Sequence, residues 1–182
     1  MIEKNWDTYH SELNEALLGV SLNKIEKAVA SIRKIVGTNS TVWVIGNGGS
    51  AATASHFCVD LSKGCAIRIK KTIRAVPLMD LVPIQSAWSN DNSYGVALEM
   101  SIRHFAQRGD ILFAISGSGN SRNILNALIA AKDLGVERIG LTGFSGGKMS
   151  DLVDIEVNIP SDDMQIIEDA HHALCHFISR EI

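Results

Sequence analysis

The sequence has no long apolar run, no paired-cysteine motif and no signal-peptide core. Every apolar stretch is shorter than the ~18 residues that a membrane-spanning helix requires. The three cysteines, Cys58, Cys65 and Cys175, show no CxxC spacing, and the chain begins with a charged amphipathic segment. We therefore expect a protein of the reduced cytoplasm without a membrane span.

The chain also has no excess of positive charge, with 17 Lys and Arg against 20 Asp and Glu. The formal net charge is -3 and the isoelectric point is near 6.0, so no basic face is expected for nucleic acid. The short KKTIR cluster at residues 70–74 fits the solvated approach to a strand. The chain also lacks repeats and low-complexity segments, and its 182 residues with 46% hydrophobic content predict one globular domain.

Apolar patterning predicts an α/β fold. Two helical patterns come first, at residues 6–19 and 22–36. Short β-branched runs follow at residues 41–45, 72–76, 110–115, 137–141 and 154–159. Helical patterns alternate with them at residues 50–63, 83–89, 95–107, 121–134 and 164–181. Apolar strands separated by helices are typical of a parallel sheet covered on both faces.

Two glycine-rich turns each join a predicted strand to a predicted helix. The first is GNGGS at residues 46–50, and the second is ISGSGNS at residues 115–121. Backbone N–H groups at such a turn are free to bind an anion, and the second turn adds the hydroxyls of Ser116, Ser118 and Ser121. A phosphate monoester fits these turns, although serine and glycine also serve as simple helix caps and turn residues.

Two other phosphate motifs match poorly. Residues 46–51 satisfy the GxGxxA pattern of dinucleotide-binding folds, but no acidic residue ends the second predicted strand about 20 residues later. GFSGGKM at residues 143–149 differs from a P-loop because its glycine spacing is short and Met149 stands where Ser or Thr would bind magnesium. Neither nucleotide class is expected.

Five segments together resemble the phosphoheptose isomerase branch of the sugar isomerase (SIS) domain family. They are GNGGSAATASHF, NDNSYG at residues 90–95, ISGSGNSRNILNAL, GLTGFSGGKMSDLVDIEVNIPS and IEDAHHALCH, in the family's order. The resemblance implies a three-layer α/β/α sandwich with a five-stranded parallel sheet, forming a single SIS domain over residues 1–182. It also implies that residues 1–37 form a helical extension that packs in a homotetramer, with active sites at the subunit interfaces.

The resemblance also implies a sugar-phosphate site. The matched substrate-binding positions are Asn47, Gly48, Gly49 and Ser50 in the first turn, Ser116, Ser118 and Ser121 in the second, and Asp91 and Glu168 elsewhere. The serine turn would hold the phosphate, while Asp91 would contact sugar hydroxyls.

Catalytic and metal positions follow from the same resemblance. Asp60 matches the base and His176 the acid, and the metal positions match His56, Asp60, Glu168 and His176. Two histidines and two carboxylates suit zinc, one ion per active site, although ligand type alone leaves iron and manganese open. The family usually has glutamate at position 60 and glutamine at position 168. These two departures are compatible with an isomerase whose site is adjusted, with an isomerase for a different sugar phosphate, or with a protein that has lost catalytic activity.

Helix spacing adds a geometric expectation. His56 and Asp60 are four residues apart and project from one helix face, so both can meet one ion or one substrate. Glu168 and His176 are eight apart, ~12 Å along a helix, so both reach one ion only through a neighbouring subunit or a bend. His171 and His172 are adjacent and point in different directions, and we expect both to be outer or surface residues.

The reaction implied by the resemblance is isomerisation of sedoheptulose 7-phosphate to D-glycero-D-manno-heptose 7-phosphate, for heptose and surface polysaccharide (lipopolysaccharide) synthesis. One alternative is a non-catalytic SIS module, either a sugar-phosphate sensor or an adaptor of the replication-initiation type. Another is an isomerase for a different phosphosugar. The adaptor branch typically lacks the acidic base and the last histidine, whereas this chain retains Asp60 and His176.

Overall fold

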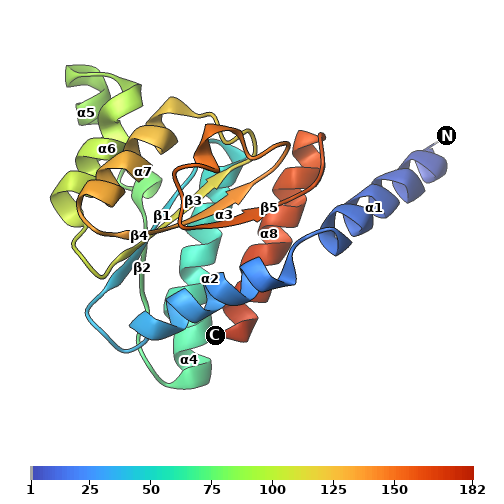
Figure 1. Cartoon of the computed structure of the whole chain (residues 1–182), viewed down its shortest axis with the longest axis horizontal. Helices are drawn as coiled ribbons and strands as arrows, with labels where there is room; N and C mark the ends of the chain where they lie inside the picture. The colour runs from blue at the N-terminus through green and yellow to red at the C-terminus, as the bar shows by residue number, and fades with distance from the viewer. Residues whose placement is uncertain (1) are drawn as a thin grey trace.

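The computed structural model describes residues 2–182 as a five-stranded parallel sheet with helices on both faces (Figure 1). The strand order is β2-β1-β3-β4-β5. The strands are β1 (Thr41–Ile45), β2 (Arg74–Pro77), β3 (Ile111–Ser116), β4 (Glu137–Thr142) and β5 (Ile155–Asn158). Every pairing is parallel, which confirms the predicted fold class.

The helices alternate with the strands after a leading pair. They are α1 (Ile2–Leu18), α2 (Leu22–Ile35), α3 (Gly49–Val59), α4 (Ala66–Ile69), α5 (Val82–Asp91), α6 (Tyr94–Phe105), α7 (Arg122–Asp133) and α8 (Met164–Glu181). Two 3-10 turns, Leu78–Asp80 and Gly147–Met149, and a π-helix, Asp60–Cys65, complete the described elements.

Side chains of β3 alternate between two hydrophobic cores. Ile111, Phe113 and Ile115 pack into the core formed with α2, α3 and α8. Leu112 and Ala114 face the opposite core, formed with α6 and α7. Because every residue of β3 is buried, this central strand is apolar on both faces, as a parallel sheet requires.

The predicted strands and helices agree with the structure within a few residues. The largest difference follows α3, where one continuous helix was expected over residues 50–63. The chain instead changes to π-helical geometry from Asp60 to Cys65, with Leu61 and Cys65 buried. Single π-turns within α-helices often occur at functional sites.

The leading helices lie on the α8 side of the molecule. α2 packs against the sheet through buried Ile25, Val29 and Ile32, whereas α1 projects away from the body (Figure 1). The Tyr9 hydroxyl donates a hydrogen bond to Asp169 of α8 at 2.6 Å. Among residues 2–182, no helix has both the length and the apolarity needed to cross a membrane.

Candidate active site

The two glycine-rich turns lie side by side because β1 and β3 are neighbouring parallel strands. Ile45, the last residue of β1, pairs with Ala114 near the end of β3. Both turns therefore leave the same edge of the sheet, where open α/β sheets bind their ligands. Gly48 has a φ of 52°, a left-handed conformation that glycine adopts without the strain a side chain would add.

A small pocket of about 130 Å³ lies between these turns and the start of α8. Of the predicted substrate-binding residues, its lining includes Asn47, Ser50, Ser116, Ser118, Ser121 and Glu168. Ser50 and Ser116 are buried, while Ser118 and Ser121 are partly exposed. The pocket combines hydroxyl groups with backbone N–H groups at the first turns of α3 and α7, a setting suited to a phosphate.

The GFSGGKM segment supports the serine turn from behind. Gly119 has a φ of 61°, and a Cβ there would lie 1.9 Å from the carbonyl oxygen of Gly146. The Met149 backbone N–H donates to the Gly119 carbonyl at 2.9 Å, and Lys148 N–H donates to Asn120 Oδ1 at 3.2 Å. This segment, which is not a P-loop, therefore holds the serine turn in position.

Asn47 is held by two residues that were not predicted. Its side chain and that of buried Asn123 donate to each other, at 2.9 and 2.8 Å. The Tyr94 hydroxyl also donates to Asn47 Oδ1, at 2.6 Å. Both new residues lie inside quoted motifs, NDNSYG and ISGSGNSRNIL, so the segments were identified but these side chains were not.

Glu168 lies at the phosphate-sized pocket, away from the imidazoles. Its carboxylate lies against Gly49, where an added Cβ would be 2.8 Å from Oε2 and 2.9 Å from Oε1. The positive end of the α3 dipole stabilises a carboxylate in this place. Asp91 is exposed at the end of α5, where its Oδ1 accepts a hydrogen bond from Asn90, and it does not line this pocket.

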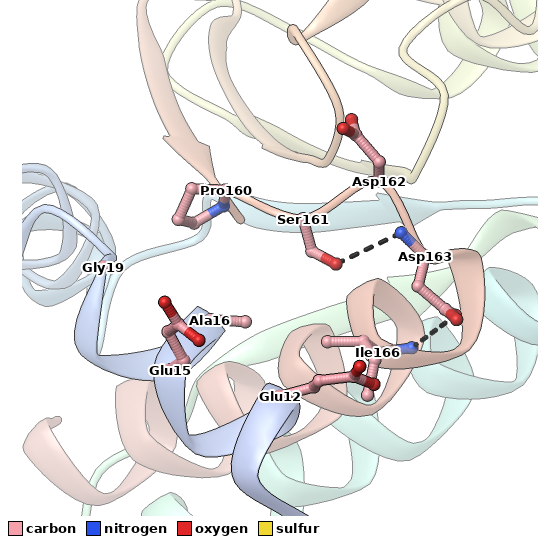
Figure 2. A pocket seen from close by; sticks show the side chains of 9 residues that line it. All are labelled: Glu12, Glu15, Ala16, Gly19, Pro160, Ser161, Asp162, Asp163 and Ile166. Carbon is pink, nitrogen blue, oxygen red and sulfur yellow. Dashed lines mark hydrogen bonds between the residues drawn. The ribbon is translucent and has the colours of Figure 1, made fainter. Parts of the chain in front are cut away.

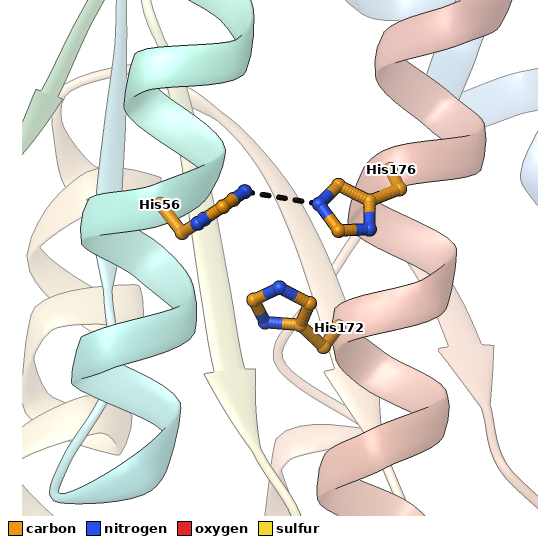
Figure 3. Close-up of side chains that lie close together, drawn as sticks. All are labelled: His56, His172 and His176. Atoms are coloured by element: carbon orange, nitrogen blue, oxygen red, sulfur yellow. Dashed lines mark hydrogen bonds between the residues drawn. The ribbon is translucent and has the colours of Figure 1, made fainter.

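Three imidazoles meet between α3 and α8 (Figure 3). His56 comes from α3, and His172 and His176 come from successive turns of α8. One ring nitrogen of each lies within 4.8 Å of those of the other two, and the Nε2 atoms of His56 and His176 are 2.9 Å apart. These three side chains could hold a metal ion.

Asp60 adds a carboxylate to this cluster. Its Oδ2 lies 3.7 Å from His56 Nε2 and 3.6 Å from His176 Nε2. The same oxygen is buried and has no hydrogen-bond partner among the described residues. A buried carboxylate oxygen without a donor is costly, and a cation is one group that would satisfy it.

The two adjacent histidines of α8 point in different directions, as expected, and His172 is partly exposed. His172 belongs to the imidazole cluster, with its Nδ1 3.4 Å from Thr53 Oγ1. Burial, together with the neighbouring His176 and His56, lowers the pKa of His172 and keeps its lone pair available. His171 instead donates to the Thr142 carbonyl at 3.0 Å, and burial lowers its pKa to about 4.

The distances among His56, Asp60 and His176 suit one tetrahedral ion. Ligand atoms at ~2.0–2.1 Å from a tetrahedral zinc lie about 3.3 Å from one another. The observed separations of 2.9, 3.6 and 3.7 Å among His56, Asp60 and His176 bracket that value. Donor types and spacing therefore fit a divalent cation.

The serine pocket and the imidazole cluster lie along the same pair of helices. On α3, Gly49 contacts Glu168, Thr53 contacts His172, and His56 contacts His176. The partners on α8 are four residues apart, ~6 Å per step along the helix. A ligand held by the serine turn could therefore extend along α3 and α8 toward the imidazoles.

A larger hollow of about 660 Å³ lies elsewhere, between α1 and the segment before α8 (Figure 2). Its lining includes Glu12, Glu15, Asp162 and Asp163. Four carboxylates with no basic partner in the lining would repel a phosphate. The smaller serine pocket is therefore the better candidate for a sugar phosphate.

Known proteins are similar to this chain in sequence and in fold. A family model described as the SIS domain matches residues 6–143. The phosphoheptose isomerase of Aliarcobacter butzleri is 36% identical over 180 residues, covering 95% of this chain and 93% of that protein. The structure matches phosphoheptose isomerase GmhA from Neisseria gonorrhoeae with a TM-score of 0.90 and 25% identity, covering 99% of this chain and 97% of that one. A phosphoheptose isomerase from Francisella tularensis matches with a TM-score of 0.90 and 27% identity, covering 99% and 95% of the two chains.

The fold and the family model together define a SIS-domain protein. Within that family, the chain belongs to the phosphoheptose isomerases.

Proposed function

We propose that this chain is an aldose-ketose isomerase that converts sedoheptulose 7-phosphate to D-glycero-D-manno-heptose 7-phosphate. Its relatives are phosphoheptose isomerases over nearly their whole length. The observation that carries the proposal is that α3 and α8 join a serine-lined pocket to a cluster of one carboxylate and three imidazoles. The serine-lined pocket suits the phosphate, and the carboxylate and imidazoles suit proton transfer at the other end of the sugar.

The proposed phosphate site is the turn bearing Ser116, Ser118 and Ser121. Its hydroxyls and the N–H groups beginning α7 donate hydrogen bonds to the phosphate oxygens. Asn47, oriented by Asn123 and Tyr94, donates to the sugar beside Gly48, Gly49 and Ser50. Asp91 is proposed to contact sugar hydroxyls from the exposed end of α5, and Glu168 borders the substrate within the pocket.

Asp60 is the proposed base. It takes a proton from C1 of the ketose, the released electron pair forms a C1–C2 double bond, and the C2 oxygen takes up a proton from His176 or from water to give an enediol. The C1 hydroxyl then loses its proton as the C1 carbonyl forms, while Asp60 returns its proton to C2. This transfer accounts for about 10²–10⁴-fold of rate, and the net reaction moves hydrogen without an oxidant.

His176 is proposed to manage charge on the sugar oxygens, as a proton donor when protonated or as a cation ligand when neutral. The proposed cation is zinc, one per active site, and the notable candidate ligands are His56, Asp60 and His176. When bound, zinc would withdraw charge from the sugar's carbonyl oxygen. Glu168 was expected to be a further ligand, but its place against Gly49 favours the substrate pocket.

The proposed setting is the cytoplasm, where the product would feed heptose and lipopolysaccharide synthesis. A homotetramer is proposed, with residues 1–37 as the helical extension of a single domain over residues 1–182. Exposed apolar side chains on these first helices support an interface there, since Trp6, Leu18 and Leu22 are 65%, 78% and 68% exposed. Light scattering of the purified protein tests this assembly.

The function is tested by following sedoheptulose 7-phosphate by NMR with wild type, Asp60→Ala and His176→Ala, each with and without zinc. Heptose 7-phosphate formed by wild type and lost in Asp60→Ala supports the proposal. Folded, metal-loaded wild type that binds the sugar phosphate without turnover would instead indicate a non-catalytic sensor. Turnover of another phosphosugar only would replace the substrate and retain the reaction class.

A further inference from the structure

The imidazole cluster contains one more histidine than the expected metal positions. His172 faces His56 and His176, and its ring lies 4.7 Å, centroid to centroid, from each of theirs. This side chain comes from the turn of α8 between Glu168 and His176. His172 therefore lies on the same face of α8, one turn after Glu168 and one turn before His176.

Glu168 lies one turn before His172 on α8 and does not reach the imidazole cluster. Its carboxylate is held against Gly49 at the start of α3, whereas the imidazoles face residues 53–60. The separation of eight residues from His176 amounts to ~12 Å along α8. With His172 in the cluster, one chain supplies three imidazoles and the Asp60 carboxylate without any contribution from position 168.

The orientation of His172 suits a ligand. Thr53 Oγ1 lies 3.4 Å from His172 Nδ1, and a hydroxyl that accepts from Nδ1–H leaves Nε2 with a free lone pair. Metal-binding histidines usually donate their second ring N–H to such a partner.

We infer that His172 is the third imidazole ligand of a divalent-cation site completed by His56, His176 and Asp60 of the same chain, and that Glu168 lies outside this site. The proposed ligand is thus His172, one turn after Glu168 on α8. Glu168 instead lines the sugar-phosphate pocket. In this arrangement His176 binds the cation through Nε2 and does not serve as the proton donor. The inference deepens the proposed function and rests on it only for the identity of the sugar.

The test is metal binding by the full chain without substrate. Protein freed of metal is titrated with Zn²⁺ against a chromophoric chelator, and with Co²⁺ while its visible absorption reports the coordination geometry. The variants are His172→Ala and, as the matched control one turn away, Glu168→Gln. Circular dichroism and thermal melts of each confirm that it is folded, and Thr53→Val provides a milder change if His172→Ala does not fold.

Wild type is expected to bind one Zn²⁺ per chain and to give the intense absorption of four-coordinate Co²⁺. His172→Ala is expected to weaken Zn²⁺ binding by more than about 100-fold, beyond the roughly 10–100-fold that loss of an outer hydrogen-bond partner costs. Thr53→Val is expected within that smaller range, and Glu168→Gln within about threefold of wild type.

Loss of binding in Glu168→Gln with retention in folded His172→Ala would overturn the inference, as would a folded wild type that binds none of these ions. The sugar assay separates this result from the proposed function. Metal bound as expected with no isomerisation overturns only the function, whereas isomerisation by metal-free protein with no measurable Zn²⁺ binding overturns only the inference.

Discussion

Asn47 and Asn123 form a reciprocal amide pair across the two glycine-rich turns, each donating its Nδ2–H to the other's Oδ1. The pair couples the turn after β1 to the first turn of α7. We predict that Asn123→Ala destabilises the protein by about 1–3 kcal/mol, because the half-buried Asn47 amide loses its partner and the buried Asn123 side chain is removed. It should also raise the KM for the sugar phosphate with a smaller effect on kcat.

Tyr94→Phe is the matched control for that network. It removes only the bond from the exposed Tyr94 hydroxyl to Asn47 Oδ1, so its effect on stability should stay below about 1 kcal/mol. Steady-state kinetics and urea unfolding of both variants provide the measurement. Equal KM values for Asn123→Ala and wild type would contradict a positioning role for this pair.

Gly119 is predicted to be intolerant of any side chain. Gly119→Ala adds a Cβ at a positive φ and 1.9 Å from a backbone oxygen, so the GFSGGKM segment or the serine turn must shift. We expect a loss of several kcal/mol in the free energy of unfolding and weaker binding of inorganic phosphate. Gly64→Ala is the control, because a Cβ there meets nothing within 4 Å and its φ is not positive. Similar melting temperatures for the two variants would argue against this packing.

Glu168→Gln is expected to lower the KM for the sugar phosphate. The carboxylate lines the same pocket as the serine turn, where a like charge costs on the order of 1 kcal/mol at intermediate dielectric, or about fivefold in binding. Glutamine has nearly the same shape without the charge. Glu168→Asp, which retains the charge, should show no such gain in binding measured by calorimetry. A higher KM in Glu168→Gln would mean that the carboxylate accepts hydrogen bonds from sugar hydroxyls.

His171 should make the protein sensitive to mild acid. Its pKa is lowered by burial to about 4, while an unfolded histidine has a pKa of about 6.5. The unfolded chain therefore binds the proton first, so stability is lost as pH falls from about 6.5 to about 4, by about 3 kcal/mol in total. Below about pH 4, His171 causes no further loss in the free energy of unfolding.

The measurement is the free energy of unfolding at several pH values with excess chelator, for wild type and His171→Gln. Glutamine can still donate to the Thr142 carbonyl but does not titrate. The wild-type curve should fall more steeply between pH 6.5 and 4. Parallel curves would show that His171 takes up its proton without unfolding.

The sequence was sufficient to predict the order of strands and helices because buried parallel strands are apolar runs and the helices between them have a clear period. The switch to π-helix at Asp60 could not be predicted, since it depends on how Leu61 and Cys65 pack beneath α8. The two glycine-rich turns were located from the sequence because each one joins a predicted strand to a predicted helix, where free backbone N–H groups can bind an anion.

Side-chain partners were harder to predict than the turns. His172 and His176 are four residues apart, and this spacing alone places them on one face of α8. The prediction considered His172 only beside adjacent His171 and did not use its four-residue spacing from His176. Asn123 and Tyr94 gave no sequence signal of their own, because their contact with Asn47 depends on the neighbouring positions of β1 and β3.

The central claim is that Asp60 transfers a proton between C1 and C2 of a sugar phosphate held at the serine turn. The most direct measurement is incubation of metal-loaded protein with sedoheptulose 7-phosphate in D₂O, with NMR detection of heptose 7-phosphate and of deuterium at C2. The carboxyl proton that Asp60 takes from C1 exchanges with D₂O while the enediol is bound, so we expect wild type to form product carrying deuterium at C2. Asp60→Asn is expected to bind the substrate with turnover reduced by at least about 100-fold. No product from folded wild type, or undiminished exchange in Asp60→Asn, would contradict the account.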